Sequence, residues 1–194
     1  MIVSTLERVQ SALSGIASRV APGRDASGRD ATPCLEIAPA DVHEACRRLR
    51  DTAGFETNTF VTAIDRFPAT PRFEVHYQFL SIAHNDRAHL VARADEPAHV
   101  PTITDLYPGT SFSERECHDM FGVVFDGHPD LRRLLMPDDY GHFPLRKDFP
   151  HQGIEPDRLY REWDAKRHAR AAEQDAAERR GTARAGPSTG GDAP

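Results

Sequence analysis

An alternating run near the middle of the chain limits the possible folds most strongly. Within RFEVHYQFLSI, residues 72–82, four apolar residues alternate with three polar ones: Phe73, Val75, Tyr77 and Phe79 against Glu74, His76 and Gln78. A period of two is typical of a strand with one buried face and one face in water. Two further runs, TFVTAID at 59–65 and AHLVARA at 88–94, flank it across turn-forming residues. The pattern therefore predicts antiparallel neighbours in an α+β fold rather than a doubly wound sheet.

Two amphipathic helices are predicted before these strands. Apolar residues recur every three or four positions from Ile2 to Val20, as on a helix with one buried side. A second helix is predicted to begin with Asp41 as its cap and to end at Gly54. The residues CLEIAP at 34–39 are predicted to be extended. We therefore expect residues 1–126 to form an α+β domain, with a small mixed or antiparallel sheet and packed helices.

Proline changes the character of the chain after residue 126. Five prolines fall in an otherwise polar segment: Pro129, Pro137, Pro144, Pro150 and Pro156. Because proline interrupts helices and sheets, a proline-rich extended C-terminal arm is predicted at 127–153. Residues 154–180 are predicted to form a charged helix, and residues 181–194 are predicted to be disordered.

Composition and short motifs argue against several functional classes. The sequence has 24 Lys and Arg against 30 Asp and Glu, a formal net charge of -6, which disfavours binding to a nucleic-acid backbone. Its three cysteines are not spaced as in a disulfide framework, a zinc site or an iron-sulfur site, and are predicted to be reduced thiols. The sequence contains neither a glycine-rich phosphate loop nor HExxH. Recognisable nucleotide and metal motifs are therefore missing from it.

The sequence also bears on location. No apolar run approaches the ~20 residues of a membrane-spanning helix, and the start of the chain lacks the pattern of a secretory leader. The chain is therefore expected to be neither secreted nor membrane-spanning. Residues 6–24 have the Ser and Arg content of an organellar transit peptide, but their regular apolar spacing favours an amphipathic helix. A mitochondrial location is kept as an alternative.

The densest group of charged residues is SERECHDMF, residues 113–121. A helix at 112–121 is predicted, closed by Gly122 and begun by a capping box between Ser111 and Glu114. Its apolar face is predicted to consist of Phe112, Cys117, Met120 and Phe121. Glu116 is expected between Phe112 and Met120 on this face, so its carboxylate should be paired with a base or raised in pKa. The candidate bases are Arg132, Arg133, Arg146 and Lys147. The polar residues expected on the opposite face are Glu114, Arg115, His118 and Asp119.

Two interpretations of Glu116 are open. It could be a catalytic acid with a tuned pKa, or one half of a structural ion pair, and the structural interpretation is favoured. A stand-alone hydrolase that uses Glu116 and His128 is a further alternative. Cys117 and His118 do not form a credible catalytic dyad, because adjacent helical side chains point about 100° apart.

Two later segments carry further charged motifs. In GHPDLRRLLMP, residues 127–137, Pro129 suits the first position of a helical turn and Asp130 complements its positive end. In PLRKDFP, residues 144–150, two bases and an acid are framed by Leu145 and Phe149. Apolar anchors beside arginine are typical of protein interfaces, so this segment is predicted to bind a partner.

These motifs together resemble the 30-kDa (C-type) subunit family of NADH-quinone oxidoreductase, respiratory complex I, which has relatives in membrane-bound hydrogenases. The resemblance is carried by ERECHDMF, GHPDLRRLL and PLRKDFP in the family's order and spacing, and more weakly by FVTAID and DLYPGTSF. It covers about Phe55 to Pro150. Two departures stand out: YGHFPLRKD places His142 one residue early and adds Phe143, and His118 replaces an aromatic residue that is frequent in the family.

The resemblance implies a non-catalytic scaffold subunit in the peripheral arm of the complex, which transfers electrons from NADH to quinone and couples this to proton translocation. It implies no catalytic residue, cofactor or metal in this chain, with FMN and iron-sulfur clusters in partner subunits. The C-terminal arm would wrap over the D-type large subunit at the quinone site, and other peripheral-arm subunits would also be partners. The alternative is the equivalent subunit of a membrane-bound nickel-iron hydrogenase, or of a related complex with a different electron donor.

The resemblance also implies a location and a set of contact residues. The chain would be peripheral, on the cytoplasmic side of the bacterial inner membrane, and would touch the membrane only through the complex. The motif positions to which it assigns a partner-holding role are Glu114, Arg115, Glu116, Asp119, Gly127, His128, Pro129, Asp130, Leu131, Arg132, Pro144, Leu145, Arg146, Lys147 and Asp148.

Overall fold

The structure is a computed structural model that describes residues 4–16, 18–21, 32–150, 165 and 168–169. The chain divides into two compact units, Met1–Phe149 and Pro150–Pro194. Of the second unit, the described residues 165 and 168–169 are helical. The rest of the predicted charged helix at 154–180 and the tail at 181–194 lie outside the described residues.

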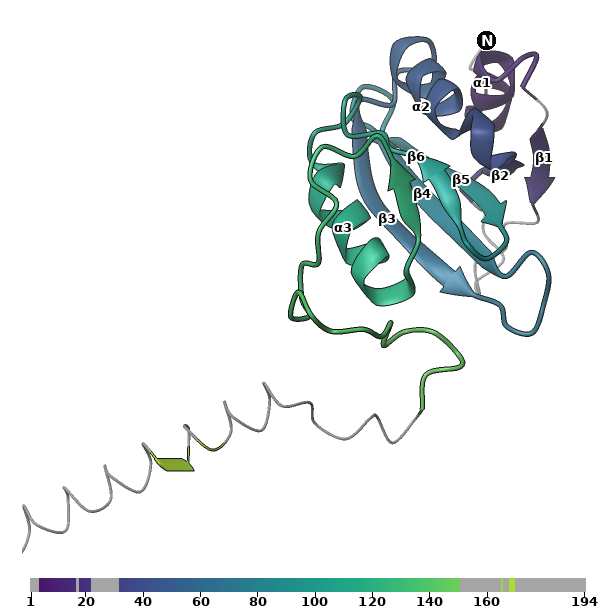
Figure 1. Ribbon diagram of the computed structural model, residues 1–194. Helices are drawn as coiled ribbons and strands as arrows, with labels where there is room; N and C mark the ends of the chain where they lie inside the picture. Colours follow the sequence, from purple (N-terminus) through teal and green to yellow (C-terminus); the bar gives the residue numbers. More distant parts are fainter. Residues whose placement is uncertain (1–3, 17, 22–31, 151–164, 166–167, 170–194) are drawn as a thin grey trace, which may run out of the picture. The chain divides into compact units, whose positions relative to one another are not determined.

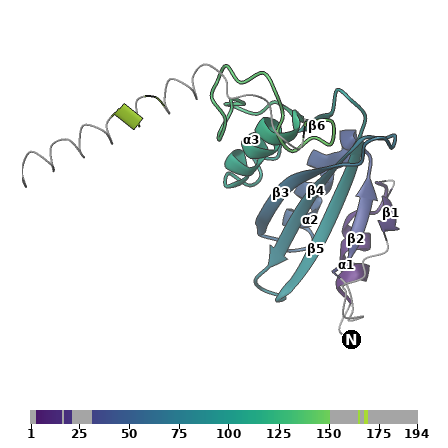
Figure 2. The ribbon, with the colours of Figure 1, turned by 90° about the horizontal axis from the view of Figure 1, so that it is seen from below.

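The first unit is built on a five-stranded mixed sheet with the strand order β1-β2-β5-β4-β3. The strands are β1 (Ser18–Ala21), β2 (Cys34–Ile37), β3 (Thr57–Asp65), β4 (Phe73–Ser81) and β5 (Asp86–Ala94). β2 and β5 run parallel, and the other neighbours are antiparallel. The three strands predicted from the alternating pattern are confirmed, as is the α+β class. Figures 1 and 2 show the sheet from two directions.

Two helices precede β3. Helix α1 (Thr5–Ala12) begins with a capping box, in which Ser4 Oγ accepts from the Glu7 N–H and the Glu7 carboxylate accepts from the Ser4 N–H. The predicted extension of this helix to Val20 is wrong, because Gly15 follows it with φ +84° and Val20 lies in β1.

The second predicted helix is confirmed as α2 (Val42–Asp51), which follows a short 3-10 helix, η1 (Pro39–Asp41). The predicted Asp41 cap is wrong, because its side chain makes no capping hydrogen bond. Gly54, with φ +71°, does turn the chain at the end of the helix.

A small second sheet and a third helix complete the regular structure. Strands β6 (His99–Pro101) and β7 (Val124–Asp126) pair in parallel, and helix α3 (Thr110–Phe121) connects them and packs against β3. The sequence analysis did not predict β6 or β7, because three residues are too few to display a period. Gly122, with φ +78°, ends α3, as predicted.

The segment after β7 lies against the domain. Residues 127–149 form turns rather than a helix or strand, yet they belong to the same compact unit as the sheet. Backbone hydrogen bonds such as Leu145 N–H to the Met120 carbonyl, at 3.1 Å, hold the segment to α3. The compact unit therefore ends at Phe149 rather than at residue 126, and contact between the arm and a partner stays a prediction.

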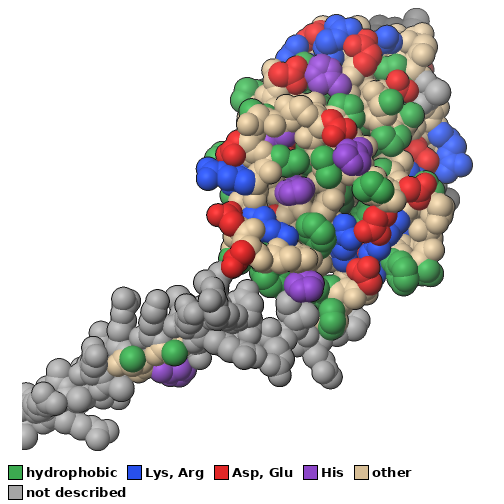
Figure 3. Space-filling view, viewed as in Figure 1, with side chains coloured by type: hydrophobic (Ala, Val, Ile, Leu, Met, Phe, Trp, Pro, Cys, Tyr) green, Lys and Arg blue, Asp and Glu red, His purple; other side chains and the backbone are tan. Residues whose placement is uncertain are grey.

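The surface of the protein mixes both signs of charge. On the face drawn in Figure 3, acidic, basic and histidine side chains are interspersed with apolar ones. Local ion pairs contribute to this mixing, for example Glu44 with Arg47 and Arg48, each at 2.7 Å. The described residues seen in this view therefore form no continuous basic patch of the kind that attracts polyanions.

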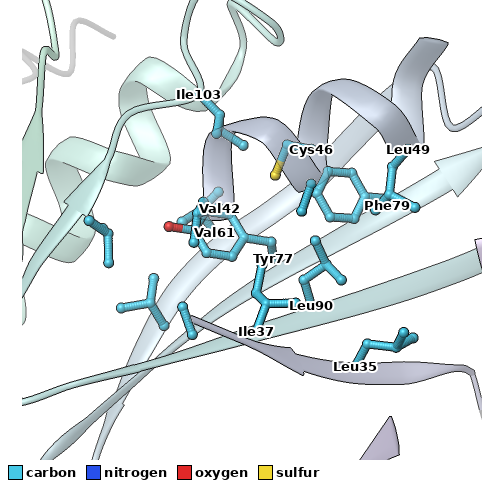
Figure 4. Close-up of a cluster of buried hydrophobic side chains, with 14 of the residues drawn as sticks. Leu35, Ile37, Val42, Cys46, Leu49, Val61, Tyr77, Phe79, Leu90 and Ile103 are labelled. Atoms are coloured by element: carbon cyan, nitrogen blue, oxygen red, sulfur yellow. The ribbon is translucent and has the colours of Figure 1, made fainter. Parts of the chain in front are cut away.

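The core lies between the sheet and the helices. The alternating residues Phe73, Val75, Tyr77 and Phe79 are all fully buried, whereas Gln78 is exposed. Figure 4 shows Tyr77 and its register partners Val61 and Leu90 in the cluster of buried side chains, with Cys46 of α2 above them. Burial of each large apolar side chain contributes about 1.5–3 kcal/mol, so this face of the sheet contributes strongly to the stability of the fold.

Candidate functional site

The structure reverses the predicted roles of the acidic residues of α3. Glu114 and Asp119 are fully buried, whereas Glu116 is exposed and makes no hydrogen bond or ion pair with a residue that the structure describes. The prediction that Glu116 lies on the apolar face is therefore wrong. Phe112, which was assigned to that face, is 64% exposed. Helical geometry explains the error: Phe112 and Glu114 point about 200° apart, so only one of them can face the sheet.

Glu114 joins α3 to the end of β6. Its carboxylate accepts from the Thr102 hydroxyl at 2.5 Å and from the Ile103 N–H at 2.9 Å. The predicted capping box is accordingly wrong: the helix begins at Thr110, after Gly109, and no side chain caps it. Burial raises the pKa of Glu114, although the hydrogen bonds oppose this rise. Both carboxylate oxygens are therefore used to link α3 to the segment that follows β6.

Asp119 fixes the turn after residue 130. Its Oδ2 accepts from three consecutive N–H groups, those of Leu134, Leu135 and Met136, at 3.0, 2.7 and 2.9 Å. Its Oδ1 lies 2.7 Å from Nη1 of Arg133. Burial by itself would raise the pKa of Asp119, but these donors hold the pKa below its usual value. Both oxygens of the carboxylate are thus bonded to groups of the same domain.

His128 and its neighbours form a second local network. His128 Nδ1 accepts from the Asp130 N–H at 3.0 Å, so the ring proton lies on Nε2, 3.2 Å from the Ser111 carbonyl. Burial lowers the pKa of His128, which favours this neutral form. Asp130 pairs with Arg132 at 3.0 Å on the surface. His128 is therefore fully engaged at the start of α3, and no contact joins it to Glu116.

The PLRKDFP segment is also engaged with its own domain. The Arg146 guanidinium donates to the Phe121 carbonyl at 2.6 Å and to Glu96 at 2.5 Å. It also lies 4.3 Å from the ring centroid of Phe143, the residue that departs from the family pattern. The backbone N–H of Lys147 donates to Asp65, and Asp148 pairs with Arg72 at 3.0 Å. Arg146 and Asp148 thus hold residues 144–149 to the domain. We call this set of contacts the arm closure.

Asp65 and Arg72 are the residues of the domain that bind Lys147 and Asp148 in the arm closure. Neither was predicted from the sequence. The Asp65 side chain is 0% exposed and pairs with Arg72 at 2.8 Å. Burial opposes ionisation, but the Arg72 guanidinium and the N–H groups of Lys147 and Phe67 lower the pKa of Asp65 to about 2. The available signal was an acid at the end of one predicted strand and a base at the start of the next, across a short turn.

Several side chains around α3 remain exposed. Phe112 is 64% exposed, Leu135 63% and Leu145 53%. Leu135 and Leu145 lie on segments whose backbone N–H groups bond directly to Asp119 and to the Met120 carbonyl. Glu116 is also exposed, four residues after Phe112 on the same side of the helix. We call these four residues, Phe112, Glu116, Leu135 and Leu145, the α3 surface.

Comparison with known proteins decides the family. Residues 35–155 match the model of the respiratory-chain NADH dehydrogenase 30 Kd subunit family. The chain belongs to this family. The predicted membership is confirmed, and the match contains the three charged motifs.

Relatives in this family are C-type subunits of NADH-quinone oxidoreductase. The chain is 40% identical over 119 residues to C-type subunit 2 of Rhizobium meliloti (strain 1021), covering 60% of this chain and 65% of that protein. It is 43% identical to the C-type subunit of Rhodopseudomonas palustris (strain BisB18), covering 62% and 61%, and 41% identical to that of Salinispora tropica, covering 62% and 51%. The matches thus span between half and two thirds of the length of these relatives.

A solved structure has the same fold. It is a chain of the membrane-bound sulfane sulfur reductase, an archaeal respiratory membrane complex, with a TM-score of 0.61 over 75% of this chain and 83% of that one. Its sequence identity of 24% shows the fold alone. In the part of the chain that the structure describes, no helix has the length and apolar character needed to span a membrane.

Proposed function

We propose that this chain is a non-catalytic scaffold subunit in the peripheral arm of NADH-quinone oxidoreductase, supporting electron transfer from NADH to quinone coupled to proton translocation. The α3 surface would dock onto the quinone-site large subunit of the complex. FMN and iron-sulfur clusters would be held by partner subunits. The chain would be peripheral, on the cytoplasmic side of the bacterial inner membrane.

The observation that carries this proposal is the exposure of the α3 surface. Three large apolar side chains, each more than half exposed, belong to α3 or to segments bonded directly to it. Asp119 and the Met120 carbonyl hold the last two segments in place, so the side chains are presented from a fixed backbone. Pre-ordered apolar side chains beside charged ones are typical of protein interfaces.

The internal contacts of the motifs support a structural rather than a catalytic role. Glu114, Asp119 and Asp65 each accept several hydrogen bonds from their own domain. A catalytic carboxylate must reach a substrate, and these three are fully buried and occupied. His128 is bonded to the Asp130 N–H and the Ser111 carbonyl, and Glu116 has no partner among the described residues. The two residues of the hydrolase alternative are therefore not joined by any contact.

Co-purification tests the assembly. The chain would be tagged in its native host, the membranes solubilised gently, and the bound proteins identified by mass spectrometry. Flavin- and NADH-binding subunits in the eluate are the expected result. A nickel-iron large subunit without them would favour the hydrogenase alternative. Repeated recovery of the chain alone would contradict the scaffold proposal.

A variant tests the docking surface itself. In Phe112→Asp/Leu145→Asp, two exposed apolar side chains become charged, so co-purification of partner subunits should fall at least tenfold while the thermal unfolding curve stays near that of the unaltered chain. The matched control is Ile82→Asp, because Ile82 is 70% exposed and follows β4, away from α3. Equal loss of partners in the control would contradict the assignment of the surface.

A further inference from the structure

Two histidines that are thirteen residues apart in the sequence meet on the second face of the sheet. His76 lies on β4 and His89 on β5, and Gln78 is the register partner of His89. The two histidines are therefore diagonal neighbours on the face opposite Tyr77. His76 Nδ1 lies 3.0 Å from His89 Nε2, with ring centroids 5.0 Å apart. Their spacing in the sequence gives no sign of a pair, because only the strand register brings these two rings together.

A neighbouring carboxylate orients one of the two rings. His76 Nε2 faces the Glu74 carboxylate at 3.5 Å. A proton on Nε2 is favoured there, which leaves the Nδ1 lone pair directed at His89. Neutral imidazole is the form that binds metal ions.

Nearby charges balance one another. Glu74 pairs with Arg66 at 2.7 Å and with Arg93 at 2.9 Å, and Arg93 also lies 3.5 Å from Glu36. Glu36 also pairs with Arg19 at 3.4 Å. Glu74 and Glu36 therefore offset most of the positive charge of the guanidinium groups near the histidines. Cys34 is the register partner of His89 across the parallel pair.

The separation of the two nitrogens fits a particular coordination angle. With metal–nitrogen bonds of about 2.0–2.1 Å, two nitrogens 3.0 Å apart subtend about 91–97° at the metal. That angle matches adjacent positions of an octahedral or tetragonal ion better than the wider angle of a tetrahedral one. Among divalent first-row ions, Ni²⁺ and Cu²⁺ combine such geometry with high affinity for imidazole.

We propose that His76 and His89 form a binding site for a divalent transition-metal ion, with Ni²⁺ and Cu²⁺ preferred, and that Glu74 orients His76. Among the described residues, no group of three or more His, Cys, Asp or Glu side chains is placed to hold a metal, so water completes the coordination. Metal binding replaces the hydrogen bond between the rings, and the Nε2 proton of His89 moves to its Nδ1 by exchange with water. The carboxylate behind His76 acts as the outer partner that metal-bound histidines commonly have. This site is independent of the proposed assembly role.

Calorimetric titration with NiCl₂ tests the site in the full chain, purified without a histidine tag. His76→Gln and His89→Gln should each weaken the tightest Ni²⁺ binding at least tenfold. The matched controls are His43→Gln and His99→Gln, because each removes an exposed histidine beside a carboxylate, Asp105 or Asp126. Binding in the controls should stay within about twofold of the unaltered chain. Unchanged binding in both sheet variants, or equal loss in the controls, would overturn the proposal.

A second measurement needs no variant and therefore decides the matter if a substitution prevents folding. Octahedral Ni²⁺ is paramagnetic and broadens the NMR signals of nearby amides. At less than one equivalent of NiCl₂, the amides of residues 75–78 and 88–91 should broaden first in the unaltered chain. Broadening centred on any other histidine, with these residues unaffected, would contradict the site.

Discussion

The charged residues of the three motifs divide into two groups that differ in burial. Glu114, Asp119 and Arg146 point into the domain and have several partners each. Glu116, Arg132 and Lys147 come from the same three motifs and point into solvent. The motif letters alone do not separate these groups. The inward group therefore shapes the surface that the outward group presents.

The two groups should respond differently to substitution. Removing one partner of a buried charge leaves the other unpaired in a region of low dielectric, which costs several kcal/mol. Removing an exposed charge costs little, because water replaces its contacts. Inward residues should therefore control the stability of the domain, and outward residues should control docking.

The largest effect is expected for Asp119→Asn. The substitution removes the charge that holds three N–H groups and Arg133, so the free energy of unfolding should fall by roughly 3–5 kcal/mol. Urea unfolding at pH 7 measures this. The matched control is Asp130→Asn, whose carboxylate pairs with Arg132 on the surface, and for which a loss of at most about 1 kcal/mol is expected. Similar losses in both variants would remove the distinction between the groups.

A pH series examines Asp65, the anchor of the arm closure. Its folded pKa of about 2 lies below the ordinary value of 3.8. As the pH falls, the unfolded chain therefore takes up the proton first, so stability is present above about pH 4 and is lost towards pH 2. The shift corresponds to about 2 kcal/mol.

Asp65→Asn isolates that contribution. The variant should be less stable at pH 7 and should lose about 2 kcal/mol less than the unaltered chain between pH 4 and pH 2. Urea unfolding at half-unit steps from pH 6 to 2 gives both curves. Parallel curves over this range would show that the contact with Arg72 does not lower the pKa of Asp65 in the folded protein.

Gly122→Ala should loosen the closure without changing a charge. Gly122 has φ +78°, and an added Cβ would lie 2.8 Å from the Phe143 ring and would also meet Arg146. We expect a loss of about 1–3 kcal/mol from backbone strain and overpacking. Hydrogen exchange of the Leu145 and Lys147 amides should accelerate. The control is Gly141→Ala, where a Cβ meets nothing within 4 Å and exchange should be unchanged.

The sequence predicted the parts of this structure that depend on local period. Phe73, Val75, Tyr77 and Phe79 alternate, and that alternation placed β4 and its core face correctly. The face of α3 was misplaced because Phe112 was counted as core, although Glu114 finds better partners inside. Partners that lie far apart in sequence, such as Asp65 with Lys147, leave no periodic signal. Tertiary contacts of this kind decided which motif residues face inward.

The smallest effect on stability is expected for Lys147→Glu. The Lys147 side chain makes no hydrogen bond or ion pair with a described residue, and its backbone N–H, which bonds to Asp65, is kept in the variant. The free energy of unfolding should therefore change by less than about 0.5 kcal/mol. The adjacent Arg146→Glu should instead cost roughly 2–3 kcal/mol, because Arg146 is 15% exposed and loses its hydrogen bonds to the Phe121 carbonyl and to the half-exposed Glu96. If the assembly proposal holds, Lys147→Glu should weaken co-purification of partner subunits although its unfolding curve is unchanged. Partner recovery equal to that of the unaltered chain would place Lys147 outside the interface, and a large loss of stability would place its side chain in the inward group.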